Sequence, residues 1–290
     1  MIIRFFKEKF KKLQKTKFRW IVAFVATIQQ SIKNLSLIYI YIDKEGHWNN
    51  FRKKRKESAK ENIIIVSPNL NVSSYNEIFS DLMNSWCHKY IPKSGDIVLD
   101  IGSGIGDQII LFSRLVGPKG LVIAIEGHPE VYRCLHKTIT ANKLKNVLSF
   151  NIAATDQEKK VYISSNFDHI TNSIINVSKG ICIEGYSLDY FFDSTKVKLP
   201  NIDFVKMNIE GAEAIALRGM NNILKKSSNV VISCHDFIVN NHGGNPELRT
   251  SNEVKKILIN LGYDLFQRND SLREEVPYYI YGINKSLTNI

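Results

Sequence analysis

A glycine-rich loop that begins with an acid is the first place where this chain could do chemistry. The loop directly follows an apolar run, and its candidate ligand contacts are Asp100, Gly102, Gly104 and Gly106. Because glycine has no Cβ, the backbone of such a loop can approach a ligand closely at the carboxyl edge of a parallel sheet. A second apolar run, 121–125, ends on Glu126, at the distance at which nucleotide-binding folds present an acid to ribose hydroxyls. Together the loop and Glu126 predict a nucleoside ligand.

The spacing of the glycines decides which nucleoside fits. Dinucleotide-binding enzymes use G-x-G-x-x-G, with the pyrophosphate at the N-terminus of the following helix. Here the third glycine comes only two residues after the second, and Asp107 follows it. The carboxylate of Asp100 would repel a pyrophosphate, whereas S-adenosylmethionine carries a sulfonium and an ammonium and no phosphate. The loop therefore favours S-adenosylmethionine over a nicotinamide cofactor, and a glycine-rich turn without a ligand is the structural alternative.

Polar side chains at the ends of two later strand-like runs are candidates for catalysis. Lys206, Asn208 and Glu210 lie at the end of one of these runs, and His235 and Asp236 follow the next. Methyl transfer from a sulfonium is an in-line displacement, in which the protein aligns donor and acceptor and removes a proton from the acceptor. Histidine has an unperturbed pKa of about 6.5, which suits a base, so we expect His235 or Asp236 to take that role. The alternative is that both residues satisfy backbone groups of a loop.

A divalent metal is a further alternative at the same strand ends. Asn208, Glu210 and Asp236 could supply oxygen ligands to a hard cation that lowers the pKa of a substrate hydroxyl. The amide of Asn208 is a neutral and weak ligand, which speaks against a metal. Glu210 and Glu213 could instead complement the dipole of a helix that begins nearby.

Positive charge is concentrated at the N-terminus. Residues 1–60 hold 16 Lys and Arg against 4 acids. The remaining 230 residues hold 23 basic and 24 acidic side chains, so the whole excess that gives the net charge of +11 lies in the first segment. A protein that grips nucleic acid needs positive surface around its active site, so we expect no nucleic-acid partner. The four cysteines form no C-x-x-C pair, and a reducing cytoplasm is the simplest setting.

The first segment has the pattern of a basic amphipathic helix. Its apolar side chains recur at steps of three and four residues, at Phe5, Phe6, Phe10, Leu13, Trp20, Ile21, Phe24, Val25 and Ile28. The uncharged stretch 20–32 is shorter than the roughly 20 apolar residues of a bilayer span. We therefore expect a helix on an anionic membrane surface, with the basic run 52–56 as a second contact, in a cytoplasmic protein peripheral to the inner face of the membrane. Two alternatives stay open, a soluble helix packed on the domain or on a partner subunit and a spanning helix that extends through 39–42.

Apolar runs and helical patterns alternate along the rest of the chain. The strand-like runs are 63–66, 96–100, 121–126, 147–152, 203–207, 229–234, 263–267 and 278–283. The helix-like stretches between them are 74–91, 107–116, 129–142, 212–226 and 251–261. Alternation of this kind predicts an α/β fold with a mostly parallel sheet and helices on both faces.

The last two strand-like runs break this alternation. Only the short polar stretch 268–276 separates them, which is too short for a crossover helix and predicts an antiparallel hairpin. A seven-stranded, mostly parallel sheet closed by a C-terminal antiparallel hairpin strand is the Rossmann-like architecture of class I methyltransferases. We expect an extension over 1–60 and a methyltransferase domain over 61–290, with its core at about 95–285 and an insertion at about 155–195 that could cover the active site.

Four segments, in the same order along the chain, carry a resemblance to a known family. They are 100–106, 187–189, 206–213 and 233–237. In these segments the chain resembles the FkbM family of S-adenosylmethionine-dependent methyltransferases, whose sequences carry an acid-led glycine loop, a Leu-Asp pair, a Lys-x-Asp-x-Glu-Gly-x-Glu run and a strand with a polar end. The resemblance covers about 95–285 and leaves the first 60 residues outside.

The resemblance implies a class I fold and methyl transfer from S-adenosylmethionine. The cofactor contacts that it implies are Asp100, Gly102, Gly104 and Glu126. It also implies that Ala153 and Ala154 lie near the adenine. The family usually has Asp where this chain has Asn208, and an amide keeps an acceptor oxygen but cannot serve as a base at neutral pH. The family role of that position is therefore open in this chain.

The resemblance also suggests the acceptor. We expect O-methylation of a hydroxyl on a sugar, a glycolipid or another small metabolite, so that the partner is a small-molecule, carbohydrate or lipid-linked substrate. A nicotinamide-dependent oxidoreductase is the rival enzyme class, and the glycine spacing disfavours it. A catalytically degenerate nucleoside-binding or membrane scaffold protein is the non-enzyme rival, which Asn208 leaves open.

Overall fold

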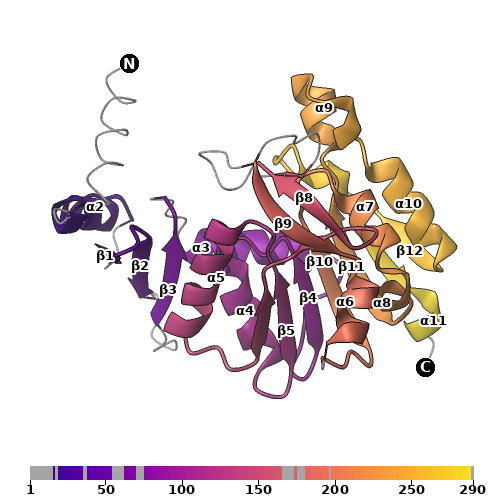
Figure 1. The fold of residues 1–290 in the computed structure, drawn as a ribbon, viewed down its shortest axis with the longest axis horizontal. Helices are drawn as coiled ribbons and strands as arrows, with labels where there is room; N and C mark the ends of the chain where they lie inside the picture. The colour runs from indigo at the N-terminus through magenta and orange to yellow at the C-terminus, as the bar shows by residue number, and fades with distance from the viewer. Residues whose placement is uncertain are drawn as a thin grey trace.

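The computed structural model describes residues 16, 19–34, 38–53, 62–69, 75–164, 173–174, 180–195 and 197–288. Within these residues the strands form a seven-stranded central sheet and two small three-stranded sheets, with helices packed on both faces of the central sheet (Figure 1). This is the α/β architecture that the alternation of apolar runs and helical patterns predicts.

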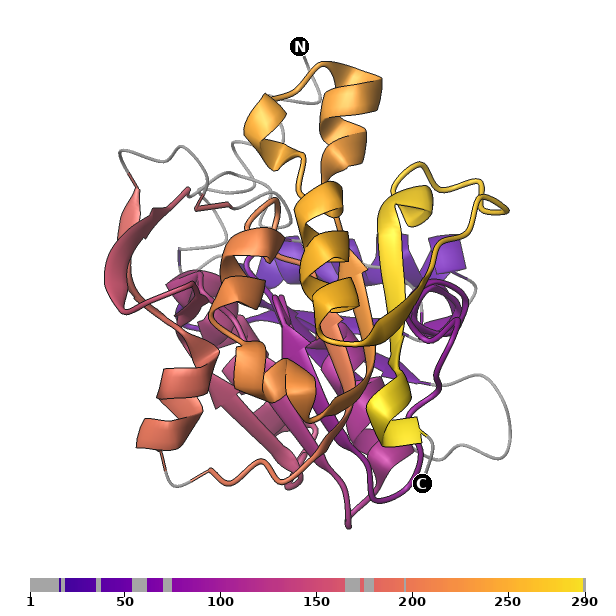
Figure 2. The same ribbon diagram turned by 90° about the vertical axis from the view of Figure 1, so that its right-hand side faces the viewer.

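The central sheet has the strand order β12-β13-β11-β10-β4-β5-β6. Its strands are β4 (Ile97–Ile101), β5 (Leu121–Ile125), β6 (Val147–Phe150), β10 (Ile202–Met207), β11 (Ser227–Ser233), β12 (Tyr263–Phe266) and β13 (Tyr279–Asn284). All neighbouring pairs from β6 to β11 are parallel, and β13 runs antiparallel to both β11 and β12. The predicted antiparallel hairpin is therefore confirmed. Figure 2 shows this C-terminal edge of the sheet, with α10 beside the yellow strand.

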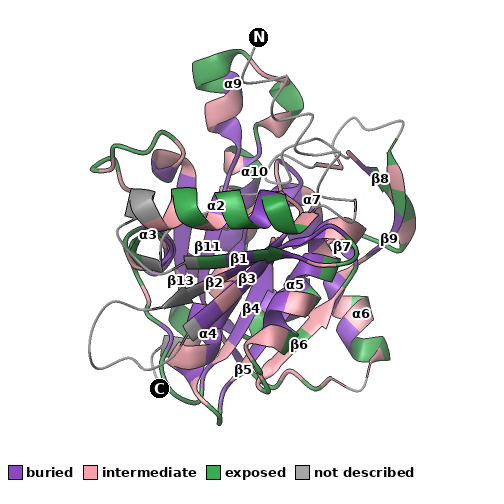
Figure 3. Ribbon diagram, turned by 90° about the vertical axis from the view of Figure 1, so that its left-hand side faces the viewer, coloured by how far each residue is buried: buried purple, intermediate pink, exposed green. Residues whose placement is uncertain are grey.

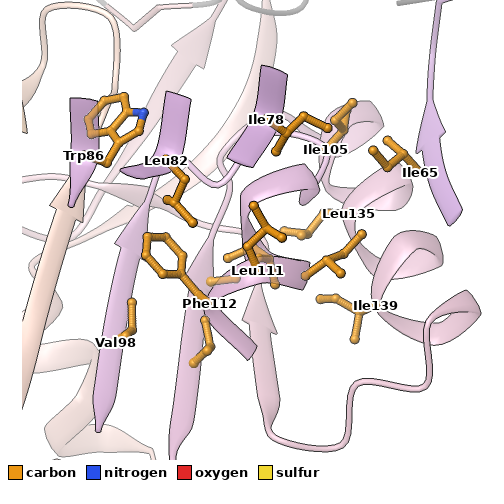
Figure 4. Packing of buried hydrophobic residues seen from close by; sticks show 14 of the residues in the cluster. Ile65, Ile78, Leu82, Trp86, Val98, Ile105, Leu111, Phe112, Leu135 and Ile139 are labelled. Atoms are coloured by element: carbon orange, nitrogen blue, oxygen red, sulfur yellow. The ribbon is translucent and has the colours of Figure 1, made fainter. Parts of the chain in front are cut away.

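Helices cover both faces of the sheet because successive strand residues point to opposite sides. The helices of this part of the chain are α3 (Tyr75–Asp81), α4 (Asp107–Val116), α5 (Pro129–Ala141), α6 (Leu188–Ser194), α7 (Glu213–Arg218), α8 (Asn221–Lys225), α9 (Asp236–His242), α10 (Ser251–Asn260) and α11 (Lys285–Thr288). Side chains of α3, α4 and α5 pack on Val98 and Val122, and those of α6, α7, α8 and α10 pack on Leu99 and Ile123. Figure 4 shows the first of these layers, in which Phe112 of α4 lies over Val98.

Two predicted helices differ from the observed ones. The helical pattern at 74–91 becomes α3 followed by a π-helical turn, Leu82–Trp86, which buries Leu82 and Trp86. The pattern at 212–226 is divided into α7 and α8 at Gly219, because a Cβ there would lie 2.1 Å from the carbonyl oxygen of Thr155. Periodicity predicts where helical residues occur but does not report such close backbone contacts.

The predicted insertion at 155–195 contributes two strands to a small sheet whose third strand precedes it. The strands of this sheet are β7 (Ala153–Ala154), just before the insertion, and β8 (Lys159–Ile163) and β9 (Ile181–Tyr186) within it, in the order β7-β9-β8. Ala153, Ile163 and Ile183 form a small apolar cluster in this sheet. The insertion therefore continues directly from the strand end that carries the two predicted adenine contacts.

The N-terminal segment adds a helix and a sheet. These elements are α2 (Arg19–Asn34), β1 (Ile38–Ile42), β2 (Trp48–Lys53) and β3 (Asn62–Ser67). Apolar residues 5–13 and basic residues 54–56 of the predicted amphipathic segment lie outside the described residues. No helix in the described part of the chain is both long and apolar enough to cross a bilayer.

The N-terminal sheet is attached to the main body through β3 and α5. The amide of Val66 donates a 3.0 Å hydrogen bond to Thr138 Oγ1, and the side chain of Asn142 bonds both the amide and the carbonyl of Ile64. Since β2 pairs with β3 along its whole length, the domain boundary predicted at residue 60 falls between two strands of one sheet. Figure 3 shows α2 lying alongside β1 at this side of the molecule.

Candidate functional site

A cavity of about 530 Å³ opens at the carboxyl ends of β4, β5, β10 and β11. It collects most of the predicted site residues, namely Gly102, Gly104, Glu126, Ala153, Ala154, Lys206, Asn208, Glu210 and His235. Asp100, Gly106 and Asp236 are not among the residues that line it. The cofactor loop and the candidate catalytic residues therefore meet in one cavity, as expected for parallel strands whose carboxyl ends lie at the same edge.

Glu126 ties the glycine loop to the end of β5. Its Oε2 accepts a 2.9 Å hydrogen bond from the Gly104 amide, and its Oε1 accepts one of 2.8 Å from the His128 amide. Burial raises the pKa of Glu126 to about 7, although these two N–H groups favour its charged form. Each carboxylate oxygen can accept a second hydrogen bond, so Glu126 remains able to bind a hydroxyl in the cavity.

Asp100 lies behind the cavity wall rather than on it. It pairs in register with Lys206 on the neighbouring strand, and Lys206 Nζ donates a 2.8 Å hydrogen bond to Asp100 Oδ1. The ammonium also lies 4.6 Å from the ring centroid of Trp86, which covers the ion pair. Burial raises the pKa of Asp100, while Lys206 opposes that shift. Asp100 Oδ2 is buried and has no hydrogen-bond partner among the described residues.

The three loop glycines have three different surroundings. A Cβ on Gly102, whose φ is +79°, would lie 1.9 Å from the carbonyl oxygen of Asn208. The backbones of the β4–α4 and β10–α7 loops are therefore in close contact at this point. Gly104 has open space around it. Gly106 precedes α4 and faces α5, where a Cβ on this residue would lie only 2.6 Å from Leu135 Cδ1. Gly106 thus permits close helix packing rather than a cavity contact.

His235 stands between two carboxylates. Its Nδ1 lies 2.8 Å from Oε1 of the fully buried Glu213, and its Nε2 lies 3.3 Å from Oε2 of Glu210, which reaches the cavity. Burial opposes the charged ring, but Glu213 and Glu210 outweigh it and raise the pKa of His235 to about 10. Both carboxylates therefore favour the protonated ring, which makes His235 a weaker candidate for the base than a histidine without such partners.

Glu213 is the residue of this cluster that the sequence describes least well. The sequence suggests only an acid near a helix N-terminus, whereas the carboxylate also accepts hydrogen bonds from the Gly211 amide and from Thr250 Oγ1. Burial disfavours its charge, yet His235 lowers the pKa of Glu213 below its usual value. No local signal pairs positions 213 and 235, because only the fold brings them together.

Asp236 is turned toward α10. Its Oδ2 accepts hydrogen bonds from the amides of Thr250 and Ser251, and its Oδ1 accepts one from Ser251 Oγ. Its carboxylate thus satisfies the N-terminus of that helix, which is the loop-satisfying alternative named for this residue. Among the described residues no group of three or more His, Cys, Asp or Glu side chains could hold a metal, and Asp236 does not join Asn208 and Glu210 as a ligand.

The remaining cavity wall contains residues that the sequence did not single out. Asp81 and Trp86 come from α3 and the π-helical turn, Phe237 comes from α9, and Arg273 and Tyr279 come from the C-terminal hairpin. Arg273 forms ion pairs with Asp81 and Glu275. Phe237 lies in the segment 233–237 that carries the resemblance and Tyr279 in the strand-like run 278–283, but neither was chosen as a site residue, and no motif marks Asp81, Trp86 or Arg273.

Comparisons with known proteins give a family and some distant relatives. The model of the methyltransferase FkbM domain matches residues 100–265. A protein-L-isoaspartate O-methyltransferase of Methanococcus aeolicus is 29% identical over 146 residues, which are 47% of this chain and 66% of that protein. The ubiquinone/menaquinone biosynthesis C-methyltransferase UbiE of Pseudomonas paraeruginosa is 28% identical over 110 residues, 35% of this chain and 42% of that protein. The chain thus spans less than two thirds of the length of each relative.

Among solved structures, the methyltransferase FkbM from Methylobacillus flagellatus is similar to this chain. The two share 18% sequence identity with a TM-score of 0.45, over 66% of this chain and 44% of the other.

Proposed function

The chain belongs to the methyltransferase FkbM domain family, and from this premise we propose that it transfers a methyl group from S-adenosylmethionine to an acceptor hydroxyl. The observation that carries the proposal is the single cavity lined both by the loop Gly102–Gly104 with Glu126 and by the Glu210–His235 pair. One part of this lining suits a nucleoside, and the other can receive a proton.

The lining fits this cofactor on several counts. Gly104 leaves open space above the loop, Glu126 can accept ribose hydroxyls, and Ala153 lies in an apolar wall suited to an adenine. Asn208 Oδ1 is a buried acceptor with no donor among the described residues, and an ammonium group supplies such donors. When bound, S-adenosylmethionine supplies a methyl group on a sulfonium. The rest of the reaction requires alignment of the acceptor and removal of its proton.

Glu210 is the proposed base. Glu210 lines the cavity, and Oε2 of its carboxylate lies 3.3 Å from Nε2 of the His235 ring. As the acceptor oxygen gains the methyl group, its proton passes to Glu210, and the electrons of the broken carbon–sulfur bond stay with sulfur. His235 is a positioning residue here, because its own proton is kept by Glu213 and Glu210. Asn208 contributes an acceptor oxygen and no base.

The charges of the wall support an uncharged acceptor. Asp81, Asp107 and Glu275 add carboxylates to the cavity wall. The cations Lys206 and Arg273 are each paired with carboxylates. An anionic acceptor, such as a phosphorylated sugar, would meet net repulsion there. The aromatic rings of Trp86, Phe237 and Tyr279 also line the cavity, and aromatic faces pack well on sugar rings. A neutral carbohydrate, free or as the head of a glycolipid, is therefore the acceptor class we propose.

Calorimetric titration tests the cofactor. We expect binding of S-adenosylmethionine and S-adenosylhomocysteine, no binding of NAD, and at least about tenfold weaker binding by Glu126→Gln, which loses charge-assisted hydrogen bonds. Glu247→Gln, a change at an exposed position outside the cavity, is the matched control. Binding of NAD alone would favour the oxidoreductase.

Transfer of labelled methyl groups tests the reaction. Incubation of the protein with labelled donor and fractionated cell extract should place the label in neutral carbohydrate or glycolipid fractions. Label confined to anionic fractions would contradict the acceptor class. No transfer in any fraction, despite cofactor binding, would favour a nucleoside-binding scaffold.

A further inference from the structure

The bulky apolar side chains of α2 point away from the protein. Trp20 is 65% exposed and Phe24 is 61% exposed, and Ile21, Val25 and Ile28 each keep more than two fifths of their surface exposed. At 100° per residue these five side chains fall on one side of the helix, and we call them the outer face of α2. A helix of a soluble domain normally turns such a face toward the core. Figure 3 shows the exposed positions along α2 in green.

The orientation of α2 is fixed by the opposite side of the helix. Val22, Ala23 and Ala26 are buried against Ile40, Ile42 and Trp48 in an apolar cluster between α2 and the N-terminal sheet. Thr27 Oγ1 also exchanges hydrogen bonds with the amide and the carbonyl of Ile40. Small residues therefore face the sheet while large ones face outward. The large side chains are thus exposed although the helix is packed on the sheet.

Three kinds of occupant could cover such a face, and charge separates them. Residues 1–60 carry 16 basic and 4 acidic side chains, and α2 contains no acid. A second copy of the chain would bring two strongly positive segments together, which repel. The described α2, with 16 residues, reaches only roughly 24 Å, which is less than a hydrocarbon core of about 30 Å, and one side of it is buried on the N-terminal sheet. An anionic bilayer attracts the basic segment and accepts the apolar face.

We propose that the outer face of α2 binds the surface of an anionic phospholipid bilayer, with the helix lying in the interface plane. Tryptophan at the rim of such a face prefers the headgroup level, and the five apolar side chains enter the acyl boundary beneath it. The basic residues around α2 in the sequence add electrostatic attraction to anionic lipids. This docking does not depend on the reaction, and it brings the whole molecule to a surface where a glycolipid head would be available.

Trp20 provides a direct readout. It is the exposed one of the three tryptophans, since Trp48 and Trp86 are each 4% exposed. Addition of vesicles of phosphatidylglycerol and phosphatidylcholine to the full chain should shift the tryptophan emission to the blue. Pure phosphatidylcholine vesicles should give a much smaller shift, and about 0.5 M salt should weaken the effect by screening. Trp20→Phe should lose the shift but still sediment with the vesicles.

A matched pair of variants completes the test. The double variant Trp20→Ser with Phe24→Ser removes two apolar contacts. Its partition coefficient into the vesicles should be lower than that of the wild type by about tenfold or more. Ile259→Ser, at a 60% exposed position on α10, should bind like the wild type. Both changes are at exposed positions and should leave the unfolding transition unchanged. Absence of binding to anionic vesicles at low salt, or equal binding by the double variant, would refute the proposal. A dimer in light scattering that the double variant dissociates would show instead that the outer face joins two copies.

Discussion

The charge on His235 follows from its two carboxylate partners. A buried histidine without partners is usually neutral, because burial disfavours the imidazolium. Here Glu213 lies 2.8 Å from one ring nitrogen and Glu210 lies 3.3 Å from the other, so the charged ring is favoured on both sides. Glu213 is fully buried, whereas Glu210 reaches the cavity. The His235 ring therefore ties the cavity residue Glu210 to the buried Glu213.

Replacement of Glu210 tests its proposed role as the base. Glu210→Gln keeps the size of the side chain but removes the group that receives the proton, so the methyl-transfer rate should fall by about 100-fold to 10,000-fold. The cofactor dissociation constant should change by less than about threefold. Single-turnover transfer and calorimetry on the same preparation measure both quantities. A variant with wild-type rate would exclude Glu210 as the base, and Glu247→Gln is the control for a generic loss of charge.

The stability of the protein should depend on pH through His235. Its pKa is raised from about 6.5 in the unfolded chain to about 10 in the folded protein. The folded state thus binds the proton more tightly, so this stabilisation is fully present below about pH 6.5 and is lost as the pH rises through about 10. Glu213→Gln removes the main favourable charge, lowers the pKa of His235 and should flatten the decline. Urea unfolding at about pH 6.5, 8 and 9.5 measures the two slopes, and parallel curves would contradict this assignment.

At the scale of elements, two loops leave the neighbouring strands β4 and β10 in close contact. The amide of Asn208, just after β10, donates a 2.9 Å hydrogen bond to the carbonyl of Ile101 at the end of β4, and the Asn208 carbonyl lies against Gly102. Glu210, in the second loop, has a φ of +55°, which is uncommon for a residue with a side chain. Such a conformation costs of order 1–3 kcal/mol and persists where the surroundings hold it. The close contact of these two loops therefore helps to hold both the glycine loop and Glu210 in place.

Two glycine substitutions distinguish the effect of this loop–loop contact on stability from the effect of a strained backbone angle alone. Gly102→Ala places a Cβ against the Asn208 carbonyl and should lower the free energy of unfolding by about 2–5 kcal/mol, from strain and overpacking together. Gly104→Ala also has a positive φ, +57°, but meets open space, so its cost should be only about 1–2 kcal/mol. Urea unfolding of both variants gives the comparison. Equal losses would mean that the loops do not constrain each other.

At the scale of the whole molecule, the N-terminal sheet packs on the domain that contains the central sheet. Ile63, Ile65 and Val66 of β3 are part of the same apolar core as α4 and α5. The buried His47 adds a polar contact, with its Nε2 2.9 Å from Glu130 of α5. The net charge nevertheless divides at about residue 60, with an excess of 12 positive charges before it and one negative charge after it. The charge of the chain therefore changes near residue 60, whereas the N-terminal sheet continues past that residue.

Truncation tests that continuity. Removal of residues 1–60 deletes β1 and β2 and leaves the ladder edge of β3 unpaired. The free energy of unfolding should fall by about 2 kcal/mol or more, because β3 loses its ladder with β2 and α5 loses the contacts of Glu130 with His47 and of Lys137 with Asp43. The exposed edge of β3 should also promote aggregation. Thermal unfolding and light scattering measure both effects. Trp20→Ser in the full chain is the control and should leave the unfolding temperature unchanged, whereas a truncated chain as stable as the wild type would show that the first 60 residues are a true appendage.

The sequence by itself determined the order of the strands of the central sheet along the chain, the hairpin at its C-terminal edge and the position of the glycine loop. It could do so because strand and helix periods, and the need for glycine in tight loops, are written in neighbouring residues. It also brought Gly102, Gly104 and Glu126 correctly to one cavity, since carboxyl ends of parallel strands share an edge. Membership of the family followed from four short segments in a fixed order. The sequence did not predict β1 and β2, because residues 39–42 were read as a possible extension of a helix.

Only the tertiary structure decided what each polar group does. Asp100 and Lys206 are 106 positions apart and meet because β4 and β10 are neighbours in the sheet. Asp236, chosen as a base candidate, satisfies α10 instead, and the adjacent His235 is charged because Glu213 is buried against it. The physical reason is that the pKa and the partners of a side chain depend on its burial and on distant residues, and these are set by packing rather than by the residues next to it in the chain.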